Sequence, residues 1–152
     1  MTRILMVCLG NICRSPLAEG ILKSKVNPAT VFVDSAGTGA WHSGELPDKR
    51  SIAIAKKYGI DITNQRARLF LVEDFDKFDK IYVMDKSNYI NVCKLAPNNN
   101  AIDKVELILN ESFPNSELEV PDPYYGGEQG FENVYNMLND ACEKIKIQLE
   151  NI

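Results

Sequence analysis

The part of this sequence that most constrains its fold lies within residues 4–16. The apolar run at 4–7 is typical of a short buried strand. Ser15 can cap a helix, and Pro16 suits a first helical turn, where a missing N–H costs nothing. Residues 8–14 are therefore predicted to form a tight loop from the C-terminal end of a strand into a helix. Such a loop directs backbone N–H groups and the positive end of the helix dipole at one point, where a phosphate dianion would bind.

The same loop contains residues suited to phosphoryl chemistry. Cys8 would lie among N–H donors near the guanidinium of Arg14, and this environment favours the thiolate, which is the nucleophilic form. Arg14 can bind two phosphoryl oxygens as a planar fork. Gly10 allows the backbone to approach the anion, and Asn11 tolerates a left-handed conformation. The Ser15 hydroxyl can donate to the thiolate and stabilise it as a leaving group.

The alternative interpretation of this cysteine is structural. A cysteine after a buried strand is commonly a small core residue, and the spacing Cys-x5-Arg arises often by chance. The preceding strand, the Gly-Asn pair inside the loop and the Ser-Pro pair after it favour the catalytic interpretation.

Beyond the loop, patterns typical of helices and strands alternate. Helices are predicted at 16–26, 49–58, 86–95 and from 131 onwards, strands at 31–33, 81–83 and 105–109, and a long loop rich in Pro, Gly and acidic residues at 110–130. This alternation predicts an α/β fold in which a four-stranded parallel sheet has helices on both faces, with the phosphate-binding loop after the first strand. We expect one domain over residues 1–152. Ligands of such folds bind at the carboxyl ends of the strands.

Composition narrows the class of protein. The formal net charge of −4 argues against nucleic-acid binding, and the longest apolar run is too short to span a membrane. No segment has the pattern of a signal peptide, so we expect a cytoplasmic location. Four scattered cysteines without a C-x-x-C pair, together with a single His, predict no metal site and no disulfide framework. We expect a monomer that needs no cofactor.

Five motifs give the chain a family resemblance. The run Cys-Leu-Gly-Asn-Ile-Cys-Arg-Ser-Pro-Leu-Ala-Glu at 8–19 resembles the phosphate-binding signature of low-molecular-weight protein tyrosine phosphatases, and Asp-Pro-Tyr-Tyr-Gly at 122–126 resembles their general-acid loop. Segments 34–38, 41–44 and 83–85 are also similar to family segments, in the expected order. The resemblance covers nearly the whole chain and implies hydrolysis of phosphotyrosine in proteins through a cysteinyl-phosphate intermediate, without a metal.

The resemblance selects the general acid. Asp122 lies between two prolines and could simply be a turn residue, and Glu119 and Glu128 are competing carboxylates on the same loop. With the nucleophile loop present, a stiff segment holding a carboxylic acid over the site becomes the better interpretation, because a phenolate leaves poorly unless it is protonated. The resemblance, rather than spacing, points to Asp122 as the acid and, with Cys8 and Arg14, as a catalytic residue.

The resemblance also implies the substrate-binding residues, which are Leu9, Gly10, Asn11, Ile12, Cys13, Ser15, Trp41, Tyr124 and Tyr125. Trp41 and the two tyrosines would line a pocket for an aryl phosphate with Leu9 or Ile12, although one tyrosine could merely close the loop. The tandem tyrosines of the family can be phosphorylated. No catalytic role carries over to His42, which we expect at the rim or the surface.

Other features concern the support of the loop. Cys13 is either a buried spectator or, as the resemblance suggests, the partner of Cys8 in a reversible disulfide. Ser35 and Asp85 are expected to hold the loop by hydrogen bonds. Many family members have a His where this chain has Gln65, so a His supporting Asn11 or Ser15 is not available here. Two further positions depart from the family by being apolar, namely Leu69 and Phe70.

Four alternatives stay open at this point. An arsenate reductase needs closely spaced downstream cysteines, whereas this chain has only Cys93 and the distant Cys142. A sugar-transport phosphocarrier would lose its phosphoryl group to water beside an Arg and an Asp. A protein arginine phosphatase tends to have Thr at the position of Ile12. A phosphate-binding module leaves Cys8 and Asp122 unexplained. The expected partners are a phosphotyrosine-containing protein as substrate, and inorganic phosphate or other oxyanions as product or inhibitors.

Overall fold

The first strand, β1 (Thr2–Cys8), lies inside a four-stranded parallel sheet whose strands are ordered β2-β1-β3-β4. The other strands are β2 (Val31–Gly37), β3 (Lys80–Val83) and β4 (Val105–Leu107). This is a computed structural model, and it describes residues 1–124 and 126–151. The register pairs Cys8 with Gly37, so the end of β1 lies beside the end of β2.

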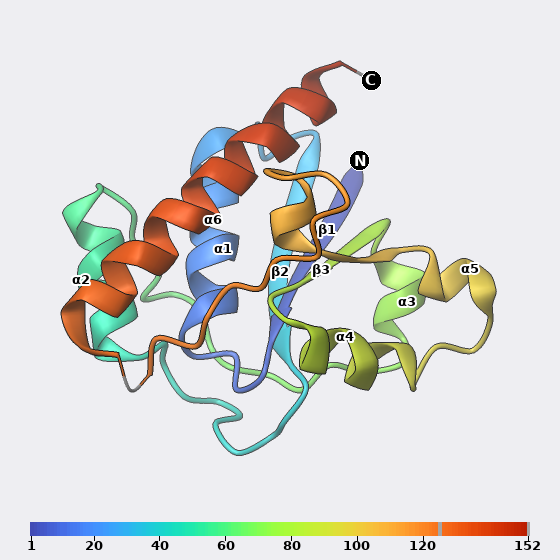
Figure 1. Cartoon of the computed structure of the whole chain (residues 1–152), viewed down its shortest axis with the longest axis horizontal. Coiled ribbons are helices and arrows are strands. Elements are labelled where there is room, and N and C mark those ends of the chain that lie inside the picture. Colours follow the sequence, from blue (N-terminus) through green and yellow to red (C-terminus); the bar gives the residue numbers. More distant parts are fainter. Residues whose placement is uncertain (125, 152) are drawn as a thin grey trace.

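Helices cover both faces of the sheet, as the sequence predicts (Figure 1). On one face lie α1 (Arg14–Lys25), α2 (Lys49–Lys57) and α6 (Gly127–Glu150). On the other lie α3 (Asp74–Lys77), α4 (Lys86–Cys93) and α5 (Asn99–Ile102). Alternate residues of β1 enter the two cores: Met6 and Cys8 pack with α1 and α6, and Leu5 and Val7 pack with the opposite layer. Burial on both sides explains why this strand is an uninterrupted apolar run.

Several predicted boundaries are wrong. The fourth strand ends at Leu107 instead of residue 109, because the chain turns into a 3₁₀ helix, η1 (Ile108–Asn110), that keeps Ile108 and Leu109 buried. The last helix begins at Gly127 rather than 131, in a stretch without apolar residues to reveal it. The short helices α3 and α5 have no counterpart in the prediction, because four residues are too few to show a helical period.

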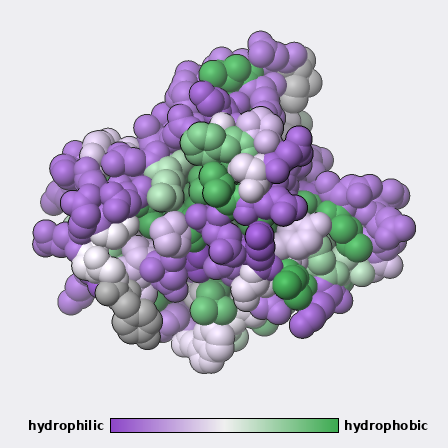
Figure 2. Space-filling model, in the orientation of Figure 1, coloured by the Kyte–Doolittle hydropathy of each residue, from purple (hydrophilic) through white to green (hydrophobic). Residues whose placement is uncertain are grey.

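The second helix is confirmed almost to the residue, because its end signals are local. The carboxylate of Asp48 accepts a hydrogen bond from the backbone N–H of Arg50 and caps α2. Gly59, with φ of 80°, follows the helix in the left-handed conformation that ends many helices. In the part of the chain that the structure describes, no helix combines the length and the apolar character needed to cross a bilayer. Hydrophilic residues predominate on the face shown in Figure 2.

Candidate active site

The loop between β1 and α1 contains only residues 9–13. Asn11 adopts the left-handed conformation, with φ of 56°, which the loop requires to turn back towards α1. The N–H groups of Thr38 and Gly39, just beyond β2, donate to the carbonyls of Cys8 and Leu9 at 3.0 and 2.9 Å. The loop is therefore anchored to the neighbouring strand on one side and continues into a helix on the other.

Asn11 organises the interior of the loop. Its side-chain carbonyl accepts from the backbone N–H of Arg68 at 3.0 Å, and because that N–H can only donate, the orientation of the amide is fixed. The amide nitrogen then donates to the hydroxyls of Ser15 and Ser35 at 2.8 and 2.9 Å. Ser35 in turn donates to Glu19 at 2.6 Å. Ser35 thus supports the loop by hydrogen bonding, as predicted from the sequence.

The hydroxyl of Ser15 lies 3.0 Å from the sulfur of Cys8. Since Ser15 accepts from Asn11, its own proton is available for the sulfur. The predicted capping role of Ser15 is wrong: Cys13 occupies the N-cap position, no side-chain hydrogen bond caps α1, and Ser15 lies inside the first turn. Both Cys8 and Ser15 are buried, so a thiolate here would be stabilised by the protein rather than by water.

Arg14, at the start of α1, is buried and held at one end. Its Nη1 atom donates to the carboxylate of Asp85 at 2.8 Å and to the carbonyl of Val120 at 2.9 Å. Burial disfavours the guanidinium charge, but Cys8 and Asp85 outweigh this effect and raise the pKa of Arg14. The two acceptors account for both Nη1 hydrogens, which leaves the Nε and Nη2 donors to bind a phosphoryl group as a fork.

A cavity of about 260 Å³ opens above the loop. Its walls include most of the predicted site residues, namely Cys8, Leu9, Gly10, Ile12, Cys13, Arg14, Trp41, Asp122 and Tyr124, together with His42. Asn11 and Ser15 do not line it but lie buried beneath it. Tyr125, the remaining predicted residue, lies outside the described residues. His42 is half-buried at the rim, where its Nδ1 atom lies 2.9 Å from the carboxylate of Glu45.

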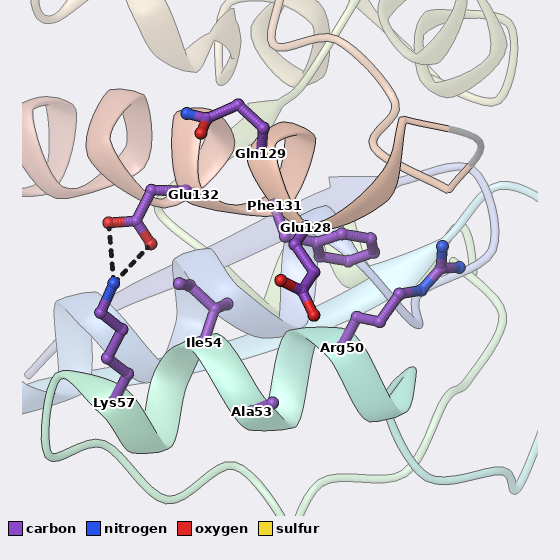
Figure 3. Close-up of a pocket in the computed structure, with 8 residues that line it drawn as sticks. All are labelled: Arg50, Ala53, Ile54, Lys57, Glu128, Gln129, Phe131 and Glu132. Atoms are coloured by element: carbon purple, nitrogen blue, oxygen red, sulfur yellow. Dashed lines mark hydrogen bonds and ion pairs between the residues drawn. The ribbon is translucent and has the colours of Figure 1, made fainter.

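The three carboxylates that compete for the acid role have different surroundings in the structure. Asp122 lines the cavity with Cys8, and its carboxylate accepts from the backbone N–H of Tyr124 at 3.0 Å. Glu119 instead accepts from the backbone N–H of Lys86 at 2.8 Å. Glu128 faces a different groove, between α2 and α6 (Figure 3). The turn geometry and the acid role of Asp122 are compatible, because the turn is what holds its carboxylate at the cavity.

Cys13 is the second thiol at the cavity. Burial, with smaller contributions from Asp48 and Cys8, raises the pKa of Cys13 to about 12. Its sulfur is therefore a neutral thiol at physiological pH. All four cysteines are free thiols in this structure. Among residues 1–124 and 126–151, no cluster of His, Cys, Asp or Glu has the arrangement of a metal site.

Some groups that support the site residues cannot be predicted from the sequence. The N–H of Arg68 and the carbonyl of Val120 orient Asn11 and Arg14, but any residue type has these backbone atoms. Gln65 does not contact Asn11 or Ser15 through a hydrogen bond; its Nε2 atom donates to the carbonyl of Pro16 at 3.0 Å, and its Oε1 atom is buried without a partner.

Comparison with known proteins places the chain among phosphatases. The family model described as low molecular weight phosphotyrosine protein phosphatase matches residues 3–151. A Schizosaccharomyces pombe protein named low molecular weight phosphotyrosine protein phosphatase is 43% identical over 93% of this chain and 92% of its own length.

Two solved structures are similar over nearly their full lengths. An Entamoeba histolytica protein tyrosine phosphatase with Hepes in its active site has a TM-score of 0.91 and 37% identity, and covers 99% of this chain and 98% of its own. A Drosophila arginine phosphatase has a TM-score of 0.86 and 32% identity, and covers 100% and 99%.

Proposed function

The chain belongs to the low molecular weight phosphotyrosine protein phosphatase family, and from this premise we propose that it hydrolyses phosphotyrosine in proteins through a phosphorylated Cys8. The main support is the meeting, around one cavity, of the Cys8 sulfur, the Arg14 guanidinium and the Asp122 carboxyl. Cys8 and Arg14 stand at the two ends of the phosphate-binding loop, and Asp122 comes from the distant segment before α6. Their meeting gives a nucleophile, an anion-binding fork and an acid in the arrangement that phosphoryl transfer needs.

In the first step, the Cys8 thiolate attacks phosphorus opposite the phenolic oxygen. The S–P bond forms as the P–O bond breaks, and Asp122 gives its proton to the departing oxygen. The Arg14 fork and the N–H groups of the loop stabilise the charge on the equatorial oxygens. This charge stabilisation needs no metal, so we expect activity in the presence of a chelator.

In the second step, water attacks the cysteinyl phosphate. Asp122, now ionised, takes a proton from this water as the new P–O bond forms, and the S–P bond breaks. The Ser15 proton, 3.0 Å from the sulfur, stabilises the thiolate as it leaves. Inorganic phosphate is released, and sulfate and other tetrahedral oxyanions should compete for the same donors.

The test is hydrolysis of an aryl phosphate in EDTA by the wild type, by Cys8→Ser and by Cys93→Ser. Cys93 is a matched control because it lies on α4 and does not line the cavity. We expect loss of turnover in Cys8→Ser and wild-type activity in Cys93→Ser. Substantial turnover by Cys8→Ser would reject the nucleophile, and loss of wild-type activity in EDTA would reject a metal-independent mechanism.

A second candidate substrate is phosphoarginine, which the similarity to the Drosophila arginine phosphatase brings into consideration. Ile12 lines the cavity. The family resemblance implies that Ile at this position favours an aromatic phosphate, because arginine-specific members tend to have Thr there. Peptides that differ only in phosphotyrosine or phosphoarginine decide between them. A higher kcat/KM for phosphotyrosine supports the main proposal, and the reverse preference overturns its substrate while keeping its mechanism.

We also propose that the protein acts as a cytoplasmic monomer. The four cysteines are scattered along a chain that is long enough to bury a core without disulfides, which is typical of proteins from a reducing compartment. Cell fractionation and sedimentation of the purified protein test the two statements separately. Recovery in a membrane or secreted fraction rejects the first, and a concentration-dependent increase in mass rejects the second.

A further inference from the structure

We propose that Arg50 is a positioning residue that sets the place of the general-acid loop over the phosphate-binding loop. This inference rests on the proposed function, because it assigns Arg50 a role that acts through Asp122. Arg50 does not belong to either loop, and it lies at the start of α2. The first turn of α2 contacts the phosphate-binding loop on one side and the general-acid loop on the other.

On one side, α2 is bonded to the phosphate-binding loop. The backbone N–H of Asp48 donates to the carbonyl of Ile12 at 2.8 Å. The hydroxyl of Ser51, which is fully buried, donates to the carbonyl of Cys13 at 3.2 Å. Two consecutive carbonyls of the loop thus receive hydrogen bonds from the same helical turn, so the start of α2 is fixed relative to the loop that surrounds the nucleophile.

On the other side, the Arg50 guanidinium reaches the general-acid loop. Its Nη1 atom donates to the carbonyl of Tyr124 at 2.7 Å. Its Nε and Nη2 atoms bind the two carboxylate oxygens of Asp48 at 3.1 and 3.2 Å. This paired contact with Asp48 fixes the plane of the guanidinium and aims Nη1 away from α2.

Ring contacts hold the guanidinium on its remaining sides. The guanidinium carbon lies 4.7 Å from the ring centroid of Phe131 on α6 and 5.1 Å from that of Tyr124. Figure 3 shows Arg50 extending from the first turn of α2 towards Phe131. Arg50 therefore connects the start of α2 with the beginning of α6 and with the segment just before α6, which contains Asp122.

A short connection leads from Arg50 to the acid itself. The carbonyl of Tyr124 accepts from Arg50, and the N–H of Tyr124 donates to the carboxylate of Asp122 at 3.0 Å. The described residues of this segment, 121–124 and 126, belong to no strand of the sheet, so the position of the segment depends on contacts of this kind. Loss of the Arg50 contacts should let the Asp122 carboxyl move relative to Cys8, and small displacements of a catalytic group reduce the rate strongly.

The experiment compares kcat/KM for aryl phosphates whose leaving phenols range from strongly to weakly acidic. Protonation by Asp122 matters most for the poorest leaving groups. Arg50→Ala should lower kcat/KM roughly 5- to 30-fold for phenyl phosphate and little for dinitrophenyl phosphate. Arg50→Lys keeps the charge but loses the paired contact with Asp48. Its kcat/KM for phenyl phosphate should lie between that of the wild type and that of Arg50→Ala. Equal loss on all substrates would overturn the proposal.

A double-mutant cycle separates a role through Asp122 from a general effect on the fold. In an Asp122→Asn background, Arg50→Ala should cause little further change, because the group that Arg50 positions is already inactive. Additive losses would overturn the proposal. If Asp122→Asn lowers kcat/KM by the same factor for every leaving group, the acid role in the proposed mechanism fails. That outcome is distinguishable from failure of the Arg50 proposal alone.

Lys57→Ala is the matched control. Lys57 also projects from α2 into the groove next to α6, where it pairs with Glu132 at 3.3 Å (Figure 3). The Lys57→Ala substitution removes a cation from the same helix and the same groove. Lys57, however, is the last residue of α2, at the opposite end of the helix from Arg50. We expect the wild-type leaving-group dependence in Lys57→Ala. A dependence like that of Arg50→Ala would attribute the effect to the groove as a whole and overturn the proposal.

Discussion

The amide nitrogen of Asn11 donates to the hydroxyl oxygen of Ser15 at 2.8 Å, so the hydroxyl proton of Ser15 is not used in this bond. That proton is available for the Cys8 sulfur at 3.0 Å, and Ser15 is the donor when the sulfur is a thiolate, which can only accept. Asn11 is itself fixed by the N–H of Arg68. A backbone group outside the phosphate-binding loop thereby fixes the amide that leaves the Ser15 proton available to the proposed nucleophile.

Ser15→Ala should slow dephosphorylation of the enzyme more than its phosphorylation. The variant leaves the departing sulfur without its hydrogen-bond donor. A charge-assisted hydrogen bond contributes about 1.5–3 kcal/mol, which corresponds to roughly a 10- to 150-fold lower rate. In rapid-mixing experiments, the burst of phenol release should therefore stand out more clearly against a slower steady state. The exposed Ser116→Ala serves as control, and an unchanged steady-state rate in Ser15→Ala would contradict the prediction.

Asp85→Asn and Asp85→Ala should separate two roles of one carboxylate. Asp85 binds Arg14, and it also caps α4 by accepting from the N–H of Asn88 at 2.8 Å. Asn can cap the helix but removes the charge opposite Arg14, so kcat/KM should fall about tenfold with little change in Tm. Ala removes both roles and should lower Tm by a further 2–4 °C, roughly. Equal Tm losses in the two variants would contradict this assignment.

The sequence predicts the fold because its signals are local and repeated. The apolar run of β1, the cap at Asp48 and the stop at Gly59 each involve residues within a few positions of one another. The start of α6 could not be predicted in the same way, because residues 127–130 lack an apolar period and begin a helix only in contact with the rest of the molecule.

The candidate site is predictable for its side chains and unpredictable for its backbone contacts. Most of the residues around the cavity lie in motifs that resemble those of a known family, and this resemblance points to them. The groups that aim them, such as the carbonyl of Val120 opposite Arg14, depend on a long-range approach of two segments. Arg50 was missed for the same reason, since its contact with Tyr124 joins residues that are 74 positions apart.

Gly39→Ala should displace Trp41 and weaken binding of aryl substrates. A Cβ atom at Gly39 would lie 1.9 Å from the indole of Trp41, so the ring can keep its place only over a glycine. Trp41 is 71% exposed and can swing away without unfolding the protein. Loss of one aromatic contact is worth about 0.5–1.5 kcal/mol, so KM for phenyl phosphate should rise roughly 2- to 12-fold while kcat changes little.

The double variant Gly39→Ala with Trp41→Ala tests whether the glycine acts through the indole. If it does, the double variant should have the same KM as Trp41→Ala alone. An additional increase in KM would show that Gly39 affects the loop directly, through its N–H bond to the carbonyl of Leu9. Melting curves of the three variants should coincide within experimental error.

Cys13 should resist alkylation even when Cys8 is absent. With the pKa of Cys13 raised to about 12, only about one molecule in 10⁴ has the thiolate form near pH 8. Peptide mapping after iodoacetamide treatment should find Cys13 unmodified in Cys8→Ser. In the wild type, modification should occur at Cys8 and be slowed by inorganic phosphate. Labelling of Cys13 as fast as that of the more exposed Cys93 would contradict the prediction.

Asp48→Ala should destabilise the protein at neutral pH, and the difference should vanish in acid. Asp48 caps α2 and binds Arg50, and removal of a helix cap costs about 1 kcal/mol. Although partial burial opposes it, hydrogen bonding from Arg50 lowers the pKa of Asp48 below its ordinary value. A lowered folded-state pKa means that this stabilisation is complete above the unfolded-state pKa and is lost as the pH falls through the folded-state value.

The measurement is the free energy of unfolding of the wild type and Asp48→Ala by urea, as a function of pH. The wild type should be more stable by about 1 kcal/mol from neutral pH down to about pH 5. Below about pH 4 the two curves should converge, because the protonated carboxyl no longer attracts Arg50. Asp48→Asn retains a capping side chain without a titrating group, so its curve should run parallel to that of Asp48→Ala. A constant gap between wild type and Asp48→Ala at every pH would mean that the charge of Asp48 does not contribute to the fold.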